Sequence, residues 1–405
     1  MATLRPFVAL RPARGKAVTV ASPPYDVVSS REARALAETG EASFLYVSRP
    51  EVGLPDGTDE HGDAAYAEGP RALDRLVARG ELEKTIAPRL FLYAQTMGEH
   101  RQIGVVACAS VDEYDRDAIK KHEKTRPDKE DDRTRHIDEL GAHDEPVFLT
   151  YRARLEVDAI VRRASASARD EDFTTADGVR HETWSLTPAD TAELVRAFAA
   201  VPALYVADGH HRSAAASRVH AKRAGTPGEH DAFLAVIFPH DQMQILAYNR
   251  LVRDDRGRSP EVILAAIEER FEVVRSSVAA PDARRSFGLY LGGAWYRATP
   301  RDLPPASDPV ASLDCSICQD QLLAPIFGVV DPRTDARVEF VGGIRGAREL
   351  ERRVDEEGFS LAVHLFPTAI EELLAVSDAG RLMPPKSTWF EPKLRSGLFV
   401  HPFLP

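Results

Sequence analysis

Hydrophobic residues recur along the chain in short runs that are separated by polar turns. One such run, 203–207, is followed by the polar stretch 208–212 and then by the alanine-rich stretch 213–224, which stops at Gly225. Because glycine commonly follows the last residue of a helix, this order predicts a strand, a tight turn and a helix. The backbone N–H groups at the start of that helix would attract an anion.

The same patterns predict the other main elements. Apolar runs predict strands at 43–47, 89–94, 102–109 and 146–151, and helical spacing predicts helices at 63–79, 187–199, 260–271, 314–323 and 368–377. Two apolar runs joined by residues 239–242 predict an antiparallel hairpin, and Gly292 with Gly293 predicts a second one. An antiparallel pair after a strand–helix unit favours an α+β protein with mixed sheets over a doubly wound sheet.

With 405 residues the chain is too long for one ordinary hydrophobic core, so we expect more than one domain. Changes in composition divide it into an N-terminal α+β region (1–110), a central region (111–255) and a C-terminal α+β region (256–405). The central region contains the strand–turn–helix unit and, ahead of it, the most highly charged part of the chain.

The composition is that of a soluble globular protein, with 43% hydrophobic and 28% charged residues and no apolar run long enough to span a bilayer. We therefore expect a cytoplasmic protein without a membrane partner. The formal charge of −11, from 52 basic and 63 acidic side chains, disfavours binding to nucleic acid. Cys315 and Cys318 lack the second pair that a zinc site needs, so we expect a structural role for them. The sequence is compatible with a homodimer.

The stretch 112–140 is highly charged, since 19 of its 29 residues are Asp, Glu, Lys or Arg. Such a stretch is commonly a solvated helix face. It also contains His122, Glu123 and Thr125 among lysines, and Arg133 follows. A glutamate beside basic groups stays ionised, so Glu123 can accept a proton from a substrate hydroxyl or bind magnesium. The second histidine of a zinc-peptidase helix is absent, which argues against a metallopeptidase.

A third polar motif lies near the C-terminus, where prolines stiffen the stretch 383–394. Two lysines and two hydroxyls in it suit an anionic ligand. They belong to Lys386, Ser387, Thr388 and Lys393. Alternatively, the same stretch covers the hydrophobic core with its aromatic residues Trp389 and Phe390. The composition leaves both interpretations open.

Four motifs, in order over nearly the whole chain, carry a family resemblance. They are SPPYDVV (22–28), KHEKT (121–125) with the pair DR (132–133), DGHHR (208–212) and MPPKSTWFEPKL (383–394). Together they resemble the bacterial and archaeal family known as domain of unknown function number one-thousand-and-fifteen. The central part of that family is in turn similar to the ParB and sulfiredoxin-like nucleotide-binding fold, whose members include free-serine kinases with a His-Glu pair upstream of a D-G-H turn.

The resemblance implies a phosphotransferase that moves a phosphate from ATP or ADP, with Mg²⁺, to the hydroxyl of a free amino acid, most readily L-serine. Glu123 would be the general base, and His122 and Asp208 would be the other catalytic residues. Asp208 would also be the metal ligand. The nucleotide would be bound by Gly209, His210, His211, Arg212 and Arg133. The substrate would be bound by Thr125, Lys386, Ser387, Thr388 and Lys393. The cation for its carboxylate would be Lys386, Lys393 or Arg133.

Two other functions would use the same residues. A ParB-like protein would bind the nucleotide as a switch that controls association with a partner. A metal-dependent hydrolase would use Asp208, His210, His211 and Glu123 around a metal ion. The chain contains no Walker A sequence and no kinase-type glycine loop, so neither common ATP signature supports the kinase. The kinase prediction depends on the ParB-like site.

Overall fold

The computed structural model describes residues 2–404. Within this range the chain forms two compact units. Unit 1 comprises residues 2–121, 125–243 and 392–404, and unit 2 comprises residues 122–124 and 244–391. Each unit is therefore built from segments that are far apart in the sequence. The regions predicted as 1–110 and 111–255 both contribute strands to the main sheet of unit 1.

Unit 1 combines many short strands with helices of up to 16 residues. Its strands are β1 (Leu4–Arg5), β2 (Leu10–Pro12), β3 (Leu82–Lys84), β4 (Phe91–Met97), β5 (His100–Ser110), β6 (Ile119–Lys120), β7 (Ala142–His143), β8 (Val147–Tyr151), β9 (Glu171–Thr174), β10 (Arg180–Ser185), β11 (Leu204–Asp208), β12 (Ala232–Pro239) and β21 (His401–Pro402). Its helices are α1 (Ala17–Val20), α2 (Ser30–Ala37), α3 (Leu45–Ser48), α4 (Asp63–Ala78), α5 (Val111–Asp115), α6 (Pro127–Leu140), α7 (Leu155–Ser165), α8 (Pro188–Phe198) and α9 (His210–Lys222), with 3-10 turns η1 (Pro50–Gly53) and η2 (His240–Gln242).

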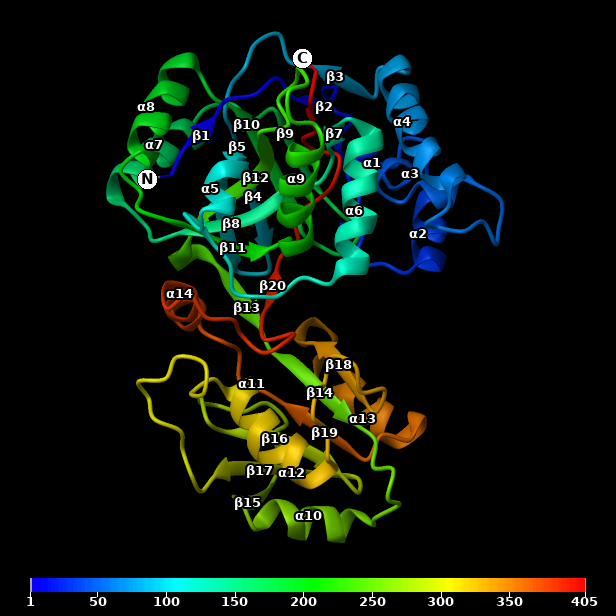
Figure 1. Ribbon diagram of the computed structural model, residues 1–405, viewed down its shortest axis with the longest axis vertical. Coiled ribbons are helices and arrows are strands. Elements are labelled where there is room, and N and C mark those ends of the chain that lie inside the picture. Colours follow the sequence, from blue (N-terminus) through cyan, green and yellow to red (C-terminus); the bar gives the residue numbers. More distant parts are fainter. Residues whose placement is uncertain (1, 405) are drawn as a thin grey trace. The chain divides into compact units, whose positions relative to one another are not determined.

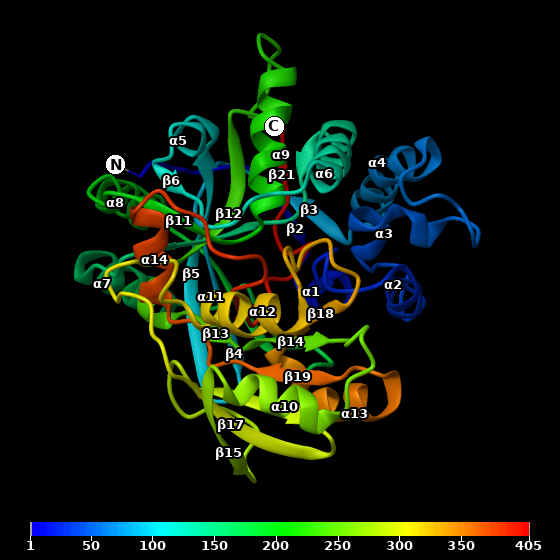
Figure 2. The same cartoon turned by 60° about the horizontal axis from the view of Figure 1, so that its bottom comes forward.

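The main sheet of unit 1 has nine strands in the order β6-β11-β8-β12-β5-β4-β10-β9, with β1 also paired to β5 (Figure 1). Strand β12 is parallel to β8 and antiparallel to β5, so the sheet is mixed. Helices α6 and α9 lie side by side, as both views show (Figures 1 and 2). The prediction of a protein that combines helices with mixed sheets is confirmed.

Strand β12 lies between β8 and β5 in the middle of this sheet, and every one of its residues is buried. Burial on both faces is typical of a strand that other elements cover from both sides. Its neighbour β5 is buried from residue 102 to residue 109. A Cβ atom on Gly104 would lie 2.8 Å from Val236 Cγ1, so the close approach of the two strands requires a residue without a side chain.

The structure overturns two predictions of local structure. Strand β12 pairs with β8 and β5, and the following strand β13 (Gln244–Leu246) pairs with β20 (Trp389–Glu391), so residues 232–248 do not form a hairpin. A strand that is apolar at every position carries no pattern that identifies its partner. Residues 43–47 contribute to the short helix α3 rather than to a strand, because a short buried apolar run does not distinguish the two.

Unit 2 contains a six-stranded sheet in the order β15-β17-β16-β19-β14-β18. Its strands are β14 (Tyr248–Val252), β15 (Phe271–Ser276), β16 (Phe287–Leu291), β17 (Ala294–Pro300), β18 (Val338–Gly342) and β19 (Leu361–His364), besides β13 and β20. Its helices are α10 (Pro260–Glu268), α11 (Asp314–Ile317), α12 (Ala324–Phe327), α13 (Gly346–Glu357) and α14 (Ile370–Asp378), with a π-helical turn η3 (Cys318–Leu323) and a 3-10 turn η4 (Gly343–Arg345).

Two sequence predictions concern unit 2. The hairpin at Gly292 and Gly293 is confirmed, since β16 and β17 pair across it. Cys315 and Cys318 are buried free thiols, which fits a structural role. Over residues 2–404, no helix is long and apolar enough to cross a membrane.

Candidate functional site

The turn between β11 and α9 has a conformation that requires glycine. Strand β11 ends at Asp208, Gly209 has φ 94° and ψ 30°, and α9 begins at His210. A Cβ atom at residue 209 would lie 3.0 Å from Arg212 Nε. Both the backbone angle and the approach of Arg212 therefore favour glycine. The result is a tight turn at the N-terminus of a 13-residue helix, which is a suitable place for an anion.

Asp208 takes part in an ion-pair cluster at this turn. Lys393 Nζ lies 2.9 Å from its Oδ2, Arg212 Nη2 lies 3.9 Å from its Oδ1, and the Gly209 N–H donates to Oδ1 at 2.8 Å. Burial alone would raise the pKa of Asp208, but the charges of Lys393 and Arg212 outweigh it and hold the pKa below its usual range. The Asp208 side chain is still 28% exposed, so an ionised carboxylate reaches the surface beside two cations.

Arg212 is buried beneath the turn. Its Nη1 donates to the Pro146 carbonyl at 2.6 Å, which fixes the guanidinium next to the start of β8. Its buried Nε has no hydrogen-bond acceptor among residues 2–404. A buried N–H group without an acceptor is costly, and an anion at the turn would satisfy it.

Lys393 is held in position by two glutamines that the sequence did not single out. Its carbonyl accepts a hydrogen bond from Gln95 Nε2 at 2.8 Å, and Gln95 Oε1 accepts one from Gln102 Nε2 at 3.0 Å. Both glutamines are fully buried, on β4 and β5. An amide within an otherwise apolar central strand is the signal that could have identified them, because buried polar groups need partners.

A buried polar network extends from this region to the SPPYDVV segment. Glu145 Oε1 accepts hydrogen bonds from the Tyr25 N–H at 2.9 Å and from the Ser396 hydroxyl at 2.7 Å. The Arg133 guanidinium lies 4.0 Å from the centre of the Tyr25 ring. Burial and a neighbouring aspartate raise the pKa of Glu145 to about 7, while Arg212 and Arg133 act in the opposite direction. Glu145 therefore interacts with both guanidinium groups.

The remaining predicted residues of unit 1 lie close to the first turn of α9. His210 is the first residue of this helix and is buried. The Arg126 N–H donates to His211 Nε2 at 3.2 Å. The neighbouring Thr125 hydroxyl donates to Glu130. The segment around Thr125 is therefore attached to the start of α9.

The other predicted site residues belong to unit 2, and they are His122, Glu123, Lys386, Ser387 and Thr388. The His122 carbonyl accepts a hydrogen bond from the Met383 N–H at 2.7 Å, and its Nε2 lies 3.5 Å from the Thr388 hydroxyl. The Ser387 hydroxyl donates to the Pro384 carbonyl at 2.6 Å within its own loop. Parts of the KHEKT and MPPKSTWFEPKL motifs therefore meet in unit 2, while Asp208, Gly209, Arg212 and Lys393 meet in unit 1.

A family model described as "Protein of unknown function (DUF1015)" matches residues 4–316, which is well over half of the chain. The chain belongs to this family. The matched range contains the SPPYDVV, KHEKT and DGHHR motifs and ends before MPPKSTWFEPKL. No curated protein matches the chain.

Three solved structures are similar to this DUF1015 protein at low sequence identity. Free serine kinase in complex with AMP has a TM-score of 0.37 and 14% identity, and the match covers 73% of this chain and 92% of that chain. A variant of free serine kinase in complex with ADP has a TM-score of 0.36, 15% identity and the same coverage. SbnI with a C-terminal truncation, from Staphylococcus aureus, has a TM-score of 0.39 and 13% identity, covering 73% and 87% of the two chains.

Proposed function

We propose that this protein is a nucleotide-dependent phosphotransferase that moves a phosphate from ATP or ADP to the hydroxyl of a free amino acid, with L-serine as the leading acceptor. The observation that carries the proposal is the turn at the start of α9. A buried Arg212 N–H without an acceptor, the Lys393 ammonium and a helix N-terminus lie around this turn. A nucleotide phosphate matches such a concentration of N–H donors and positive charge.

The nucleotide site of this proposal lies in unit 1, which would then contain the ParB/sulfiredoxin-like unit expected from the motifs. Phosphoryl transfer requires little covalent chemistry from the protein, because positioning and stabilisation of charge supply most of the rate. Arg212 would donate a hydrogen bond to a phosphate oxygen. Gly209, which has no side chain, would allow the backbone to approach the same phosphate. His210 and His211, at the start of α9, would contact the same group.

A magnesium ion fits this site if the nucleotide phosphates supply part of its ligands. Mg²⁺ prefers oxygen ligands and usually combines one or two carboxylates with substrate phosphates and several waters. Asp208 offers an ionised, partly exposed carboxylate, although both of its oxygens already accept N–H donors. Asp208 would therefore provide one ligand. When bound, the ion would neutralise charge on the phosphates.

Glu123 would accept the proton of the acceptor hydroxyl. A carboxylate among lysines is suited to this task, and a positioned base contributes roughly 10²- to 10⁴-fold to a rate. The contacts of His122 with Met383 and Thr388 fix the backbone next to Glu123. The position of Glu123 in the KHEKT motif and this fixed neighbour support the assignment.

The test is phosphoserine formation by the full chain with Mg²⁺, L-serine and either ATP or ADP, followed by mass spectrometry. We expect product from the wild type, and a loss of roughly 10²-fold or more in Glu123→Gln and Arg212→Gln. Glu156→Gln and Arg196→Gln are matched controls, because both residues are exposed on α7 and α8 and should leave the rate unchanged.

Two results would contradict the proposal. Equal rates in Glu123→Gln, Arg212→Gln and the wild type would remove both residues from the reaction. Nucleotide hydrolysis without phosphorylation of any free amino acid would favour the ParB-like switch instead.

A further inference from the structure

Unit 1 contains a second polar site, a pocket of about 330 Å³ formed by residues from the segment 25–66 and from α6. Arg49, Glu60, Lys129 and Arg133 line it. A pocket of this size is within the range of small-molecule sites. It contains side chains of both charges, and their partners within the protein show which of them a ligand can use.

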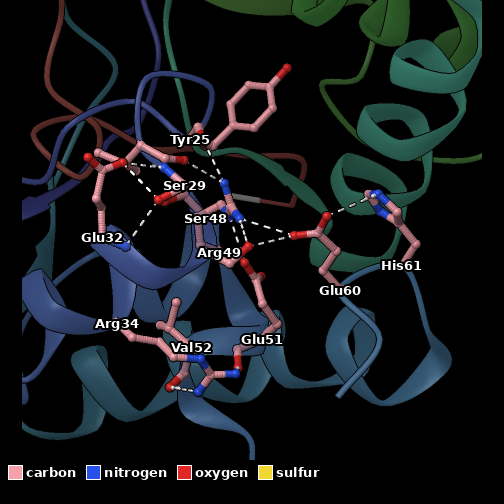
Figure 3. Close-up of polar contacts among 12 residues, drawn as sticks. Tyr25, Ser29, Glu32, Arg34, Ser48, Arg49, Glu51, Val52, Glu60 and His61 are labelled. Carbon is pink, nitrogen blue, oxygen red and sulfur yellow. Dashed lines mark hydrogen bonds and ion pairs between the residues drawn. The ribbon is translucent and has the colours of Figure 1, made fainter. Parts of the chain in front are cut away.

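Arg49 is not available to a ligand, because contacts within the protein use its whole guanidinium group. Its Nε donates to Glu51 at 2.7 Å, Nη1 donates to two backbone carbonyls, and Nη2 donates to the Ser30 hydroxyl and to Glu60 (Figure 3). Arginine has five N–H donors, and five acceptors surround this one. Arg49 therefore has a structural role and fixes one wall of the pocket.

Arg133 is different, because most of its donors have no acceptor. Only 6% of the residue is exposed, and its Nε donates to Asp132 at 2.9 Å. Its two terminal nitrogens have no hydrogen-bond acceptor among residues 2–404. A nearly buried guanidinium that lines a pocket with four such N–H groups is suited to a planar anion, above all a carboxylate bound at two points.

Asp132 positions Arg133. Its Oδ2 accepts from Arg133, while its Oδ1 accepts the Tyr66 hydroxyl at 2.7 Å and lies 3.2 Å from His61 Nδ1. Burial alone would raise the pKa of Asp132, but the charge and hydrogen bond of Arg133, together with the Tyr66 hydrogen bond, lower it to about 2. At neutral pH the carboxylate is therefore ionised. It holds Arg133 through Nε and leaves the terminal nitrogens for a ligand.

Lys129 and Glu60 are two further charged residues that line the pocket. The Lys129 ammonium has no ion pair or hydrogen bond within the described part of the chain, and it lies about one helical turn before Arg133 on α6. The Glu60 side chain is 45% exposed; its Oε2 accepts the Ser30 hydroxyl at 2.7 Å, and its Oε1 lies 3.7 Å from His61 Nε2. Glu60 Oε1 can therefore accept a further donor.

We propose that this pocket binds a free amino acid as a zwitterion, with its carboxylate on Arg133 and Lys129 and its ammonium group on Glu60. The inference rests on the function proposed above, because it names the pocket that takes the acceptor. A nucleotide polyphosphate is a poorer match, since its negative charges would face the carboxylates of Glu60 and Asp132.

The pocket and the turn at the start of α9 share one buried network within unit 1. Arg133 stacks on the Tyr25 ring, and the Tyr25 N–H donates to Glu145. The charges of Arg133 and Arg212 both act on Tyr25 and on Glu145. An acceptor bound to Arg133 would therefore lie against the same network that holds the proposed phosphate ligand Arg212.

The test is calorimetric titration of the full chain with L-serine in the absence of nucleotide. We expect binding that falls about tenfold or more in Glu60→Gln and in Lys129→Ala, since each removes a charged partner. Both residues are partly exposed, so these variants should fold. Glu68→Gln and Lys84→Ala are matched controls outside the pocket. Glycerate, which lacks the ammonium group, and ethanolamine, which lacks the carboxylate, should each bind at least about tenfold more weakly.

The inference would be overturned by no binding of L-serine, by equal affinity in the pocket variants, or by equal affinity for glycerate and L-serine. Tight binding of inorganic phosphate at Arg133 in place of L-serine would count against it as well. A separate titration of the wild type and of Arg212→Gln with ATP and ADP measures nucleotide binding. It distinguishes failure of the amino-acid pocket from failure of the proposed function. Phosphoserine formation that is indifferent to Glu60 and Lys129 would overturn the pocket alone. L-serine binding without nucleotide binding would overturn the phosphotransferase alone.

Discussion

Replacement of Gly209 by alanine tests whether the turn at the start of α9 binds phosphate. Gly209 has a φ of 94°, and a Cβ atom there would lie 3.0 Å from Nε and 3.1 Å from Cζ of Arg212. The variant therefore introduces two separate perturbations. One is strain in the backbone, and the other is displacement of a buried guanidinium by a few tenths of an ångström.

The two perturbations have different consequences. A residue with a side chain at positive φ costs about 1–2 kcal/mol, which corresponds to a fall in Tm of roughly 2–8 °C for a domain of this size. The contact with Arg212 shifts the N–H that we assign to the phosphate, and loss of one charge-assisted hydrogen bond weakens binding by about tenfold or more. We therefore expect Gly209→Ala to lower both Tm and nucleotide affinity.

Gly225→Ala provides the matched control at the other end of the same helix. Gly225 has a φ of 81°, and apart from its chain neighbours no heavy atom of residues 2–404 lies within 4 Å of the position that its Cβ would occupy. The Gly225→Ala variant should lower Tm about as much as Gly209→Ala does and leave nucleotide affinity unchanged. The assays are thermal unfolding and titration with a fluorescent ATP or ADP analogue. Wild-type affinity in Gly209→Ala, or an equal loss in Gly225→Ala, would refute the assignment.

Three further predictions follow from the contacts of unit 1. Lys393→Met should reduce nucleotide affinity about tenfold, because it removes the cation 2.9 Å from Asp208; unchanged affinity would exclude Lys393 from the site. Arg49→Lys should lower the free energy of unfolding by about 2–4 kcal/mol, because lysine cannot replace five N–H donors; an unchanged Tm would contradict this. The Tm of Glu145→Gln should rise relative to the Tm of the wild type as the pH increases from about 5 to about 8. A difference in Tm that does not change with pH would contradict this prediction.

The sign of the last prediction follows from the raised pKa of Glu145 in the folded protein. The unfolded chain loses this proton near pH 4.3, whereas the folded protein retains it up to about pH 7. Between these values the folded state holds more protons than the unfolded state. Its stability therefore falls as the pH rises through this window. Glutamine cannot ionise, so the Glu145→Gln variant does not lose stability in this way as the pH rises.

Local features of the fold were predictable from the sequence. The helical spacing of 63–79 corresponds to α4, and the strand–turn–helix around residue 209 corresponds to β11 and α9. Helix α9 starts three residues earlier than its alanine-rich stretch indicated, because Gly209 itself occupies the position before the first helical residue. The partners of β12 were not predictable, since pairing with β5 and β8 joins residues more than eighty positions apart.

The same distinction applies to the candidate site. The sequence predicted that Asp208, Gly209 and Arg212 lie at one turn, because the whole turn is contiguous in the sequence. The contacts of Gln95 with Lys393 and of Tyr66 with Asp132 join residues that are distant in the chain, and neither Gln95 nor Tyr66 belongs to a recognisable motif. The family resemblance had already made Arg133 a candidate ligand for the nucleotide or for the substrate carboxylate. Only the structure shows that Arg133 lines a pocket and that its terminal nitrogens have no acceptor among residues 2–404.

Phosphorus NMR of the full chain with Mg²⁺, L-serine and ATP, and separately ADP, tests the central claim most directly, because it follows the fate of the terminal phosphate. We predict loss of the signal of the donor's terminal phosphate, with equal growth of a phosphomonoester signal from phosphoserine. This should occur in the wild type and in Glu156→Gln but not in Glu123→Gln. Growth of inorganic phosphate alone, or no change in the nucleotide signals, would contradict the assignment of this protein as an amino-acid phosphotransferase.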